Sequence, residues 1–73
     1  MNSKNQERYR NIGLNIAKFR KAKGLTQEKL ANMVGISYSY LTKIEAKNTM
    51  QSFSLEVLFD IADTLCMDVK ELL

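Results

Sequence analysis

Residues 25–45 read LTQEKLANMVGISYSYLTKIE, and their spacing predicts two short helices joined by a sharp turn. Thr26 and Ser37 are expected N-cap residues, because a hydroxyl oxygen accepts a free backbone N–H in the first turn of a helix. Between the two helices, Gly35 can adopt a positive φ at no steric cost, so the chain can reverse there. The expected helices span residues 26–33 and 37–45.

Each of these helices has an apolar side and a polar side. Leu30, Met33 and Val34 are spaced i, i+3 and i+4, which gives the first of them one apolar stripe. Leu41 and Ile44 form the buried side of the second. Its outer side is left with aromatic, hydroxyl and cationic groups: Tyr38, Ser39, Thr42 and Lys43. Such groups suit base edges and phosphates, so residues 26–45 are expected to form a DNA-binding helix-turn-helix.

The composition favours a single all-α domain. With 73 residues the chain has room for one hydrophobic core, and 45% of its residues are apolar, which argues against disorder. It contains no Pro and three Gly, as is typical of a helical bundle. We expect a compact five-helix fold. Its other helices span residues 7–23 and 68–72, and one begins at Ser54 with Leu55, Leu58, Ile61, Ala62 and Leu65 on its inner face.

The expected domain covers residues 12–73. Residues 1–11 are almost entirely polar and form either an arm or the start of the first helix. A frayed tail is the better explanation for this segment, although its Lys4, Arg8 and Arg10 suit a contact with DNA.

Several classes of function find no support in the chain. No apolar run is long enough to span a membrane, and the N-terminus lacks the apolar core of a signal peptide, so we expect a cytoplasmic protein. With no His and a single Cys, a metal site is not expected, and Cys66 is expected to be a small buried hydrophobe. No nucleophile–base arrangement or Gly-rich phosphate loop is present, so we expect neither enzyme activity nor a cofactor.

Charge is distributed unevenly along the chain. Residues 1–50 contain ten Lys or Arg against three Glu, whereas residues 51–73 contain one Lys against five acidic residues. A polyanion is therefore expected to meet the first two-thirds of the chain. Because the basic excess coincides with the helix-turn-helix, double-stranded DNA explains it better than a chance imbalance on a solvated surface.

Several segments together form a pattern that is more specific than one Gly-centred turn: Arg20, Gly24–Ala31, Val34–Ser37, Tyr40–Glu45 and Asp60–Leu65. With them, residues 12–73 resemble the phage repressor and Cro-type helix-turn-helix family. The resemblance implies the compact repressor fold and a role in transcription regulation. It also implies a salt bridge between Arg20 and Glu45 that fixes the recognition helix, residues 37–45, on the first helix.

The resemblance assigns roles to matching positions. Gln27, the first residue of its helix, is expected to contact a phosphate and to brace the recognition helix. The positions that face DNA are Ser37, Tyr38, Ser39 and Lys43, with Thr42 as a weaker candidate. Lys43 can donate to guanine O6 and N7, while Tyr38 can reach a base edge, a thymine methyl or a phosphate. For Tyr38, an ordinary surface aromatic is the alternative.

Other polar residues are candidates for phosphate contacts. Thr26 precedes Gln27, and Lys18 and Lys21 come from the first helix, where solvated lysines are the alternative. After Glu45 the chain departs from the family, many members of which have Gly soon after this Glu and Pro ahead of the fourth helix. Further phosphate candidates lie in this segment: Lys47, Asn48, Thr49 and Gln51.

A second copy of the chain is an expected partner. One short recognition helix gives modest affinity, and a two-fold dimer places two of them about 34 Å apart on an inverted repeat. The fourth helix also carries more apolar residues than one inner face requires. The expected dimer seam contains Phe53, Val57, Phe59, Met67, Val69, Leu72 and Leu73.

These observations predict a sequence-specific DNA-binding transcription regulator, similar to restriction–modification controller proteins or mobile-element repressors. Activation and repression both stay open, and an activator needs a surface for RNA polymerase, for which Glu56, Asp60 and Asp63 are candidates. The alternative is an antitoxin-like or protein-interaction module that binds DNA only with a partner. RNA is disfavoured, because the deep, narrow major groove of A-form RNA does not admit a recognition helix.

Overall fold

The structure, a computed structural model, describes residues 4–48 and 51–73. In this part of the chain four α-helices are followed by one 3-10 turn, and no strand is present. The elements are α1 (Gln6–Ala22), α2 (Gln27–Val34), α3 (Tyr38–Glu45), α4 (Leu55–Thr64) and η1 (Val69–Glu71). The expected all-α class is confirmed, and residues 6–11 of the polar N-terminal segment belong to α1.

The expected short helix over residues 68–72 is not α-helical, and the five-helix count is not confirmed. In its place η1 is a single 3-10 turn, in which the backbone N–H groups of Glu71, Leu72 and Leu73 donate to carbonyls three residues earlier. Asp68 caps this turn, since its side chain accepts from the N–H of Lys70.

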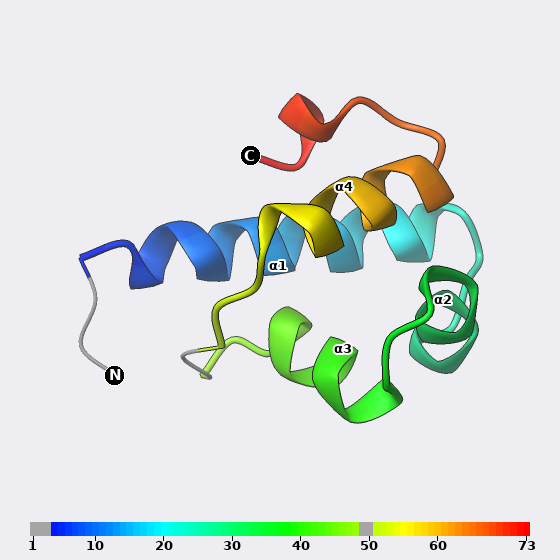
Figure 1. Ribbon diagram of the computed structural model, residues 1–73, viewed down its shortest axis with the longest axis horizontal. Helices are drawn as coiled ribbons and strands as arrows, with labels where there is room; N and C mark the ends of the chain where they lie inside the picture. The colour runs from blue at the N-terminus through cyan, green and yellow to red at the C-terminus, as the bar shows by residue number, and fades with distance from the viewer. Residues whose placement is uncertain (1–3, 49–50) are drawn as a thin grey trace.

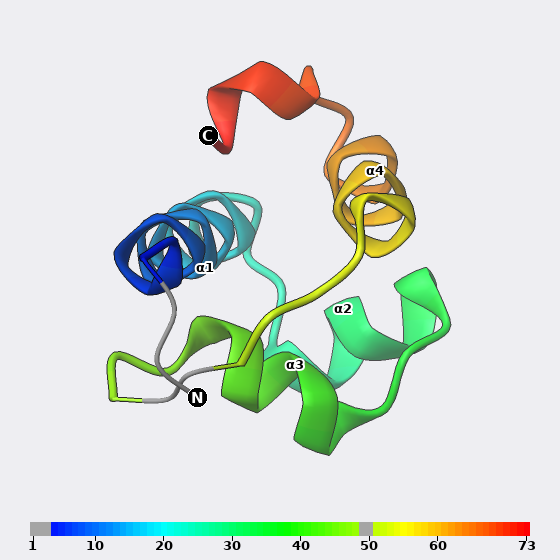
Figure 2. The same cartoon turned by 60° about the vertical axis from the view of Figure 1, so that its left-hand side comes forward.

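The helices form two layers around one core. Figure 1 shows α1 along the longest axis, with α4 beside it and with α2 and α3 on the opposite side from η1. Figure 2 shows that α1 and α4 lie side by side above α2 and α3, with the C-terminal turn over the top. The buried apolar side chains come from every α-helix and from the residues directly after α4 and η1: Ile16, Leu30, Ala31, Leu41, Ile44, Leu58, Ile61, Ala62, Leu65 and Leu72.

The turn between α2 and α3 follows the sequence prediction closely. The Thr26 hydroxyl oxygen accepts from the N–H of Lys29 at 3.1 Å, and the Ser37 hydroxyl oxygen accepts from the N–H of Tyr40 at 3.0 Å. Gly35 has a φ of 89°, in the left-handed region, and its N–H donates to the carbonyl of Ala31 at 2.9 Å. Both caps and the turn residue are therefore confirmed, and they fix where α3 begins.

Gly13 brings α1 and α3 into backbone contact. A Cβ placed on Gly13 meets the carbonyl group of Ile44, with its oxygen inside van der Waals contact and its carbon at 3.0 Å. Only the missing side chain lets the two helices approach this closely. This contact seats α3 directly on α1.

The structure corrects four expectations about burial. Leu72 is fully buried, so it cannot belong to an exposed dimer seam; its carbonyl also accepts from the Asn15 side chain at 2.9 Å. Leu55, expected on the inner face of α4, is 67% exposed, because it stands in the first turn of α4, ahead of the point where the helix packs on the core. Met33 is also exposed, since the neighbours of α2 cover only its Leu30 and Ala31 side.

Cys66 is the fourth correction, because its side chain is exposed and not a buried hydrophobe. It follows α4 with a φ of 58°. The N–H of Cys66 donates to the carbonyl of Asp63, and that of Met67 donates to the carbonyl of Ala62. This is the left-handed helix-ending turn that normally takes Gly, so the exposed Cys side chain sits on a strained backbone.

Replacing Cys66 by Gly is expected to raise the free energy of unfolding by about 1 kcal/mol, because Gly adopts this φ without strain. Urea denaturation of the two proteins measures the change. Cys66→Ala is the matched control, since it removes the thiol but keeps the Cβ. Equal stability of the Gly and Ala variants contradicts the backbone explanation.

Candidate nucleic-acid interface

The outer face of α3 is polar and open to solvent. Tyr38, Ser39 and Lys43 are exposed, and Tyr38 retains 55% of its accessible surface. They face outward because Leu41 and Ile44, on the opposite side of the helix, are buried in the core. This face presents a phenol, a hydroxyl and an ammonium group, which can donate to base edges and phosphates.

Two hydroxyl candidates near this face have internal partners. Thr42 is half-buried, and its hydroxyl donates to the carbonyl of Ser39 at 2.8 Å. Ser37 uses its oxygen to cap α3 but keeps its hydroxyl hydrogen available for an external acceptor. Ser37 is therefore better placed than Thr42 to donate a hydrogen bond to DNA.

The first residues of α2 and α3 share an open hollow of about 510 Å³. It is lined by Thr26, Gln27, Glu28 and Tyr38. The positive ends of two helix dipoles meet here, and the free N–H groups of the α2 first turn suit an anion. The negative charge of the Glu28 carboxylate, which lines the hollow, opposes the attraction of an anion. The hollow therefore suits one phosphate oxygen better than a ligand that carries several negative charges. The structure thus brings three of the predicted DNA-contacting residues together.

The predicted ion pair between Arg20 and Glu45 is present inside the core. The Arg20 Nε donates to Glu45 Oε2 at 2.9 Å, and its Nη2 donates to Oε1 at 3.0 Å. A further Arg20 nitrogen, Nη1, donates to the carbonyl of Leu25 at 2.7 Å. Arg20 therefore holds both the carboxylate at the end of α3 and the backbone just before α2.

Gln27 extends this network to the surface. Its Nε2 donates to Glu45 Oε1 at 2.9 Å, so one carboxylate binds residues of both α1 and α2. The Gln27 amide keeps a second N–H and its carbonyl oxygen for other partners. The amide is thus oriented at the edge of the hollow before any ligand arrives, as a phosphate-contacting side chain requires.

The remaining phosphate candidates are spread over two regions. Lys47 and Asn48 are exposed in the turn after α3, whereas Gln51 is half-buried and donates to the carbonyl of Ser52 at 2.7 Å. Thr49 lies outside the described residues. On α1, Lys21 is exposed next to Arg20. Lys18 precedes Arg20 by two residues, so it lies about 200° around the helix from Arg20 and points away from α3.

Sequence reasoning missed two residues of α1 that hold other elements on this helix. Gly13 seats α3 on α1, and the Asn15 amide binds the C-terminal turn. A signal for Gly13 was present, because a Gly inside a helical pattern often marks a close approach between backbones. No comparable signal identifies Asn15, whose partner lies 57 residues away in the sequence.

Two searches of the described residues bear on other functions. Among them, no helix is long and apolar enough to cross a membrane. In the same part of the chain, no group of three His, Cys, Asp or Glu side chains is arranged to hold a metal ion.

Known proteins share this arrangement. Residues 16–72 match the family model described as helix-turn-helix. Over 60 residues the chain is 43% identical to the uncharacterized HTH-type transcriptional regulator YazB of Bacillus subtilis (strain 168), covering 82% of this chain and 84% of that protein.

Two solved structures are similar as well. The restriction-modification controller protein C.AhdI from Aeromonas hydrophila matches with a TM-score of 0.84 and 30% identity, covering 92% of this chain and 98% of that one. The hypothetical transcription factor NHTF from Neisseria matches with a TM-score of 0.80 and 26% identity, over 88% of this chain and 70% of that one. The family consists of transcription regulators and not of enzymes. The chain therefore belongs to the helix-turn-helix family of transcription regulators.

Proposed function

We propose that this protein binds a specific site in double-stranded DNA as a homodimer and thereby regulates transcription. One observation carries the proposal: the exposed face of α3 bears Tyr38, Ser39 and Lys43, while its opposite face is seated on α1 by a buried ion pair. A rigid helix with an open polar face is what the DNA major groove admits. The likeness to a restriction-modification controller supports the same kind of regulation here.

The proposed contacts fall into two kinds. Lys43 and Tyr38 read base edges from α3, with Ser37, Ser39 and Thr42 beside them. Gln27 and Thr26 hold a phosphate at the start of α2, and the basic or polar residues around the face bind further phosphates. This second set contains Lys21, Lys47, Asn48, Thr49 and Gln51, whereas Lys18 is left out of it because it points away from α3.

A second copy is needed because α3 has only eight residues. At about 1.5 Å per residue it is too short to read more than part of one major groove. Two copies on an inverted repeat place their α3 helices one helical turn apart. Of the predicted seam, Phe59 and Leu73 are exposed, whereas four residues are half-buried: Phe53, Val57, Met67 and Val69.

Selection of bound duplexes from a random DNA pool tests the proposal, using the protein alone at physiological salt. Recovery of an inverted repeat supports it. Salt-sensitive bulk binding without enrichment contradicts it, and favours a module that binds DNA only with a partner protein. If the recovered site activates a promoter, the exposed Asp60 and Asp63 of α4 become the proposed surface for RNA polymerase.

Lys43→Ala and Lys21→Ala are expected to have different effects on DNA binding. Loss of Lys43 removes a base contact, so it should relax the preferred sequence and cost about 1–3 kcal/mol of discrimination at one position. Loss of Lys21 removes a phosphate contact, so it should weaken binding to all duplexes and lower the slope of log K against log salt by about 1. Repeating the selection and the salt titration with each variant measures both. An unchanged preferred sequence for Lys43→Ala rules out its base-reading role.

A further inference from the structure

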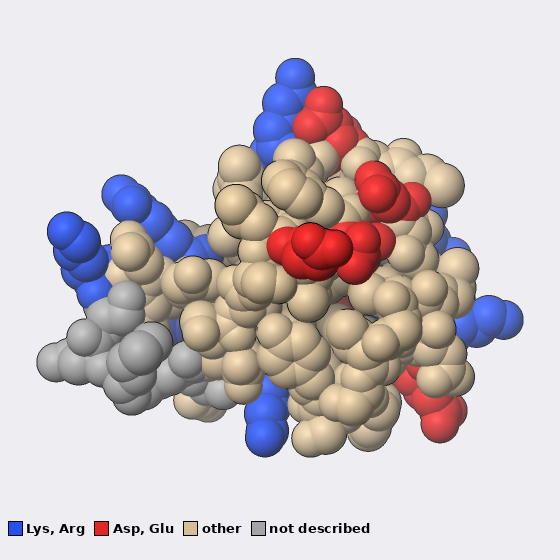
Figure 3. All heavy atoms as spheres, viewed as in Figure 1, with Lys and Arg blue, Asp and Glu red and all other residues tan. Residues whose placement is uncertain are grey.

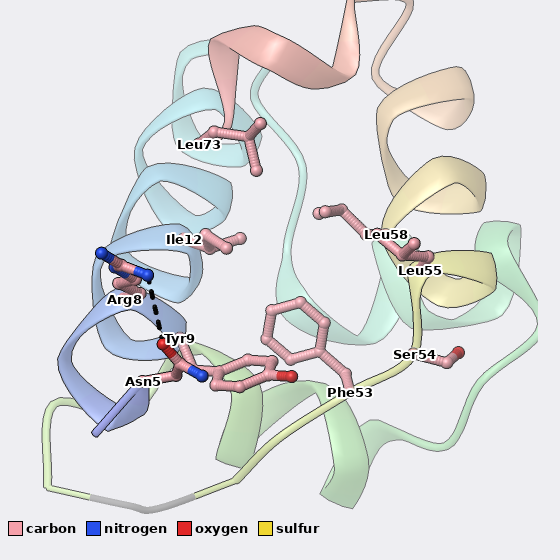
Figure 4. Close-up of a pocket in the computed structure, with 9 residues that line it drawn as sticks. All are labelled: Asn5, Arg8, Tyr9, Ile12, Phe53, Ser54, Leu55, Leu58 and Leu73. Carbon is pink, nitrogen blue, oxygen red and sulfur yellow. Dashed lines mark hydrogen bonds between the residues drawn. The ribbon is translucent and has the colours of Figure 1, made fainter. Parts of the chain in front are cut away.

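An apolar hollow of about 520 Å³ opens on the side of the molecule, away from the outer face of α3. Figure 4 shows it between α1 and α4, with the C-terminal residue above and the segment before α4 below. Its apolar walls are formed by Tyr9, Ile12, Phe53, Leu55, Leu58 and Leu73. The Tyr9 and Phe53 rings pack edge to face at its base, with centroids 5.1 Å apart.

Apolar side chains also project at the edge of this hollow. Leu55 and Leu73 line it and are 67% and 68% exposed, and Phe59 lies one turn beyond Leu55 on α4. A recess flanked by projecting Leu side chains has the shape of a self-complementary surface, in which each copy fills the recess of the other. Leaving this much apolar surface in water is unfavourable for a small monomer.

Side chains of opposite charge lie on the two sides of the hollow. On the α1 side Arg8 forms part of the rim, and its guanidinium donates to Asn5 at 3.2 Å. On the α4 side Glu56 and Asp60 are exposed. Figure 3 shows the same division on this face, with blue side chains where α1 begins, red ones over α4 and uncharged surface between them.

We infer that this hollow is the docking surface for a second copy of the chain, and that Arg8 of each copy faces Glu56 of the other. The inference rests on the homodimer of the proposed function. Both α3 helices must meet the same side of the DNA, so the two-fold axis runs from the α1–α4 layer toward the α2–α3 layer. Rotation about this axis exchanges the α1 edge of the hollow with the α4 edge. The basic edge of one copy then meets the acidic edge of the other, twice per dimer.

This surface differs from the seam that the sequence suggests. It shares Phe53 and Leu73 with that seam, but it adds the start of α1 and the first turn of α4. Leu55 becomes a contact because it is exposed at the edge of the recess. Val69 and Met67 become peripheral, since neither lines the hollow.

A charge exchange tests the inference by sedimentation equilibrium of the full chain without DNA. Arg8→Glu alone and Glu56→Arg alone each place like charges opposite one another, and each should raise the dimer dissociation constant by about tenfold. The double variant restores opposite charges and should return the constant to near that of the wild type. Lys23→Glu is the matched control, because it makes the same charge change at the far, exposed end of α1 and should have no effect.

Leu73→Asp provides a second measurement that does not depend on the ion pairs. It places a carboxylate in the apolar contact and should raise the dissociation constant by at least about a hundredfold, while thermal unfolding confirms that the monomer folds. A wild-type chain that stays monomeric contradicts the homodimer itself. A wild-type dimer that none of the variants weakens shows that the homodimer is right and this surface wrong. Weakened single variants without rescue in the double variant overturn the pairing of Arg8 with Glu56.

Discussion

Glu45→Ala is expected to lower the free energy of unfolding by about 3–5 kcal/mol, because it leaves the Arg20 guanidinium buried without its counter-charge. The two side chains retain only 8% and 3% of their exposure, so water cannot replace the lost carboxylate. Gln27 loses its partner in the same step. Small domains have about 5–15 kcal/mol of stability in total, so a large fraction is removed. Urea denaturation followed by circular dichroism measures the loss.

Three further variants separate the sources of this effect. Gln27→Ala removes only the surface branch of the network and should cost about 1 kcal/mol. The double variant Arg20→Met with Glu45→Leu leaves no buried charge but loses the hydrogen bonds to Leu25 and Gln27, so it should cost about 2 kcal/mol, clearly less than Glu45→Ala. Glu45→Gln keeps the shape but loses the charge, so its stability should fall between wild type and Glu45→Ala. A double variant as unstable as Glu45→Ala contradicts the explanation by an uncompensated charge.

Gly13→Ala should destabilise the protein by about 3 kcal/mol, although Ala is the better helix former. This value is near the upper end of the usual cost of adding a side-chain atom to a well-packed core. The added Cβ meets the Ile44 carbonyl, which is backbone and cannot rotate away. Relief requires α1 and α3 to move apart, which also lengthens the contacts between Arg20 and Glu45. The orientation of α3 changes as a result, so specific DNA affinity should fall together with stability.

Ala17→Gly, on the same helix, is the control for helix propensity. It exchanges the same two residue types in the opposite direction and should cost about 1 kcal/mol. Thermal unfolding of both variants gives the comparison. If Gly13→Ala instead stabilises the protein by the amount that propensity predicts, the two backbones are not in contact.

Local chemistry explains why so much of the helix-turn-helix was predictable. Thr26, Ser37 and Gly35 act on backbone groups within four residues of themselves, so their roles follow from the sequence without knowledge of the rest of the fold. The ion pair of Arg20 with Glu45 spans 25 residues. It was expected only from the resemblance to known repressors, and no local rule identifies it.

The errors arise where burial depends on neighbours that are distant in sequence. Leu55 and Leu72 are both apolar and both sit near the end of an element, yet one is 67% exposed and the other fully buried. Periodicity assigns a side chain to a helix face, but it does not tell whether another element covers that face. Cys66 was misjudged for a related reason, because an apolar stretch gave no sign of the left-handed turn that exposes it.

The sequence by itself determined the all-α class, the caps and turn of the helix-turn-helix, and the polar character of the face that α3 presents. These depend on spacing and on hydrogen bonds between near neighbours. Only the tertiary structure decided that Gly13 brings two backbones together, that Glu45 binds Arg20 and Gln27 at once, and that Arg8 of α1 and Leu55 of α4 line one apolar hollow. Each of these depends on the packing of helices that are far apart in the chain, and their relative positions are set by the whole core.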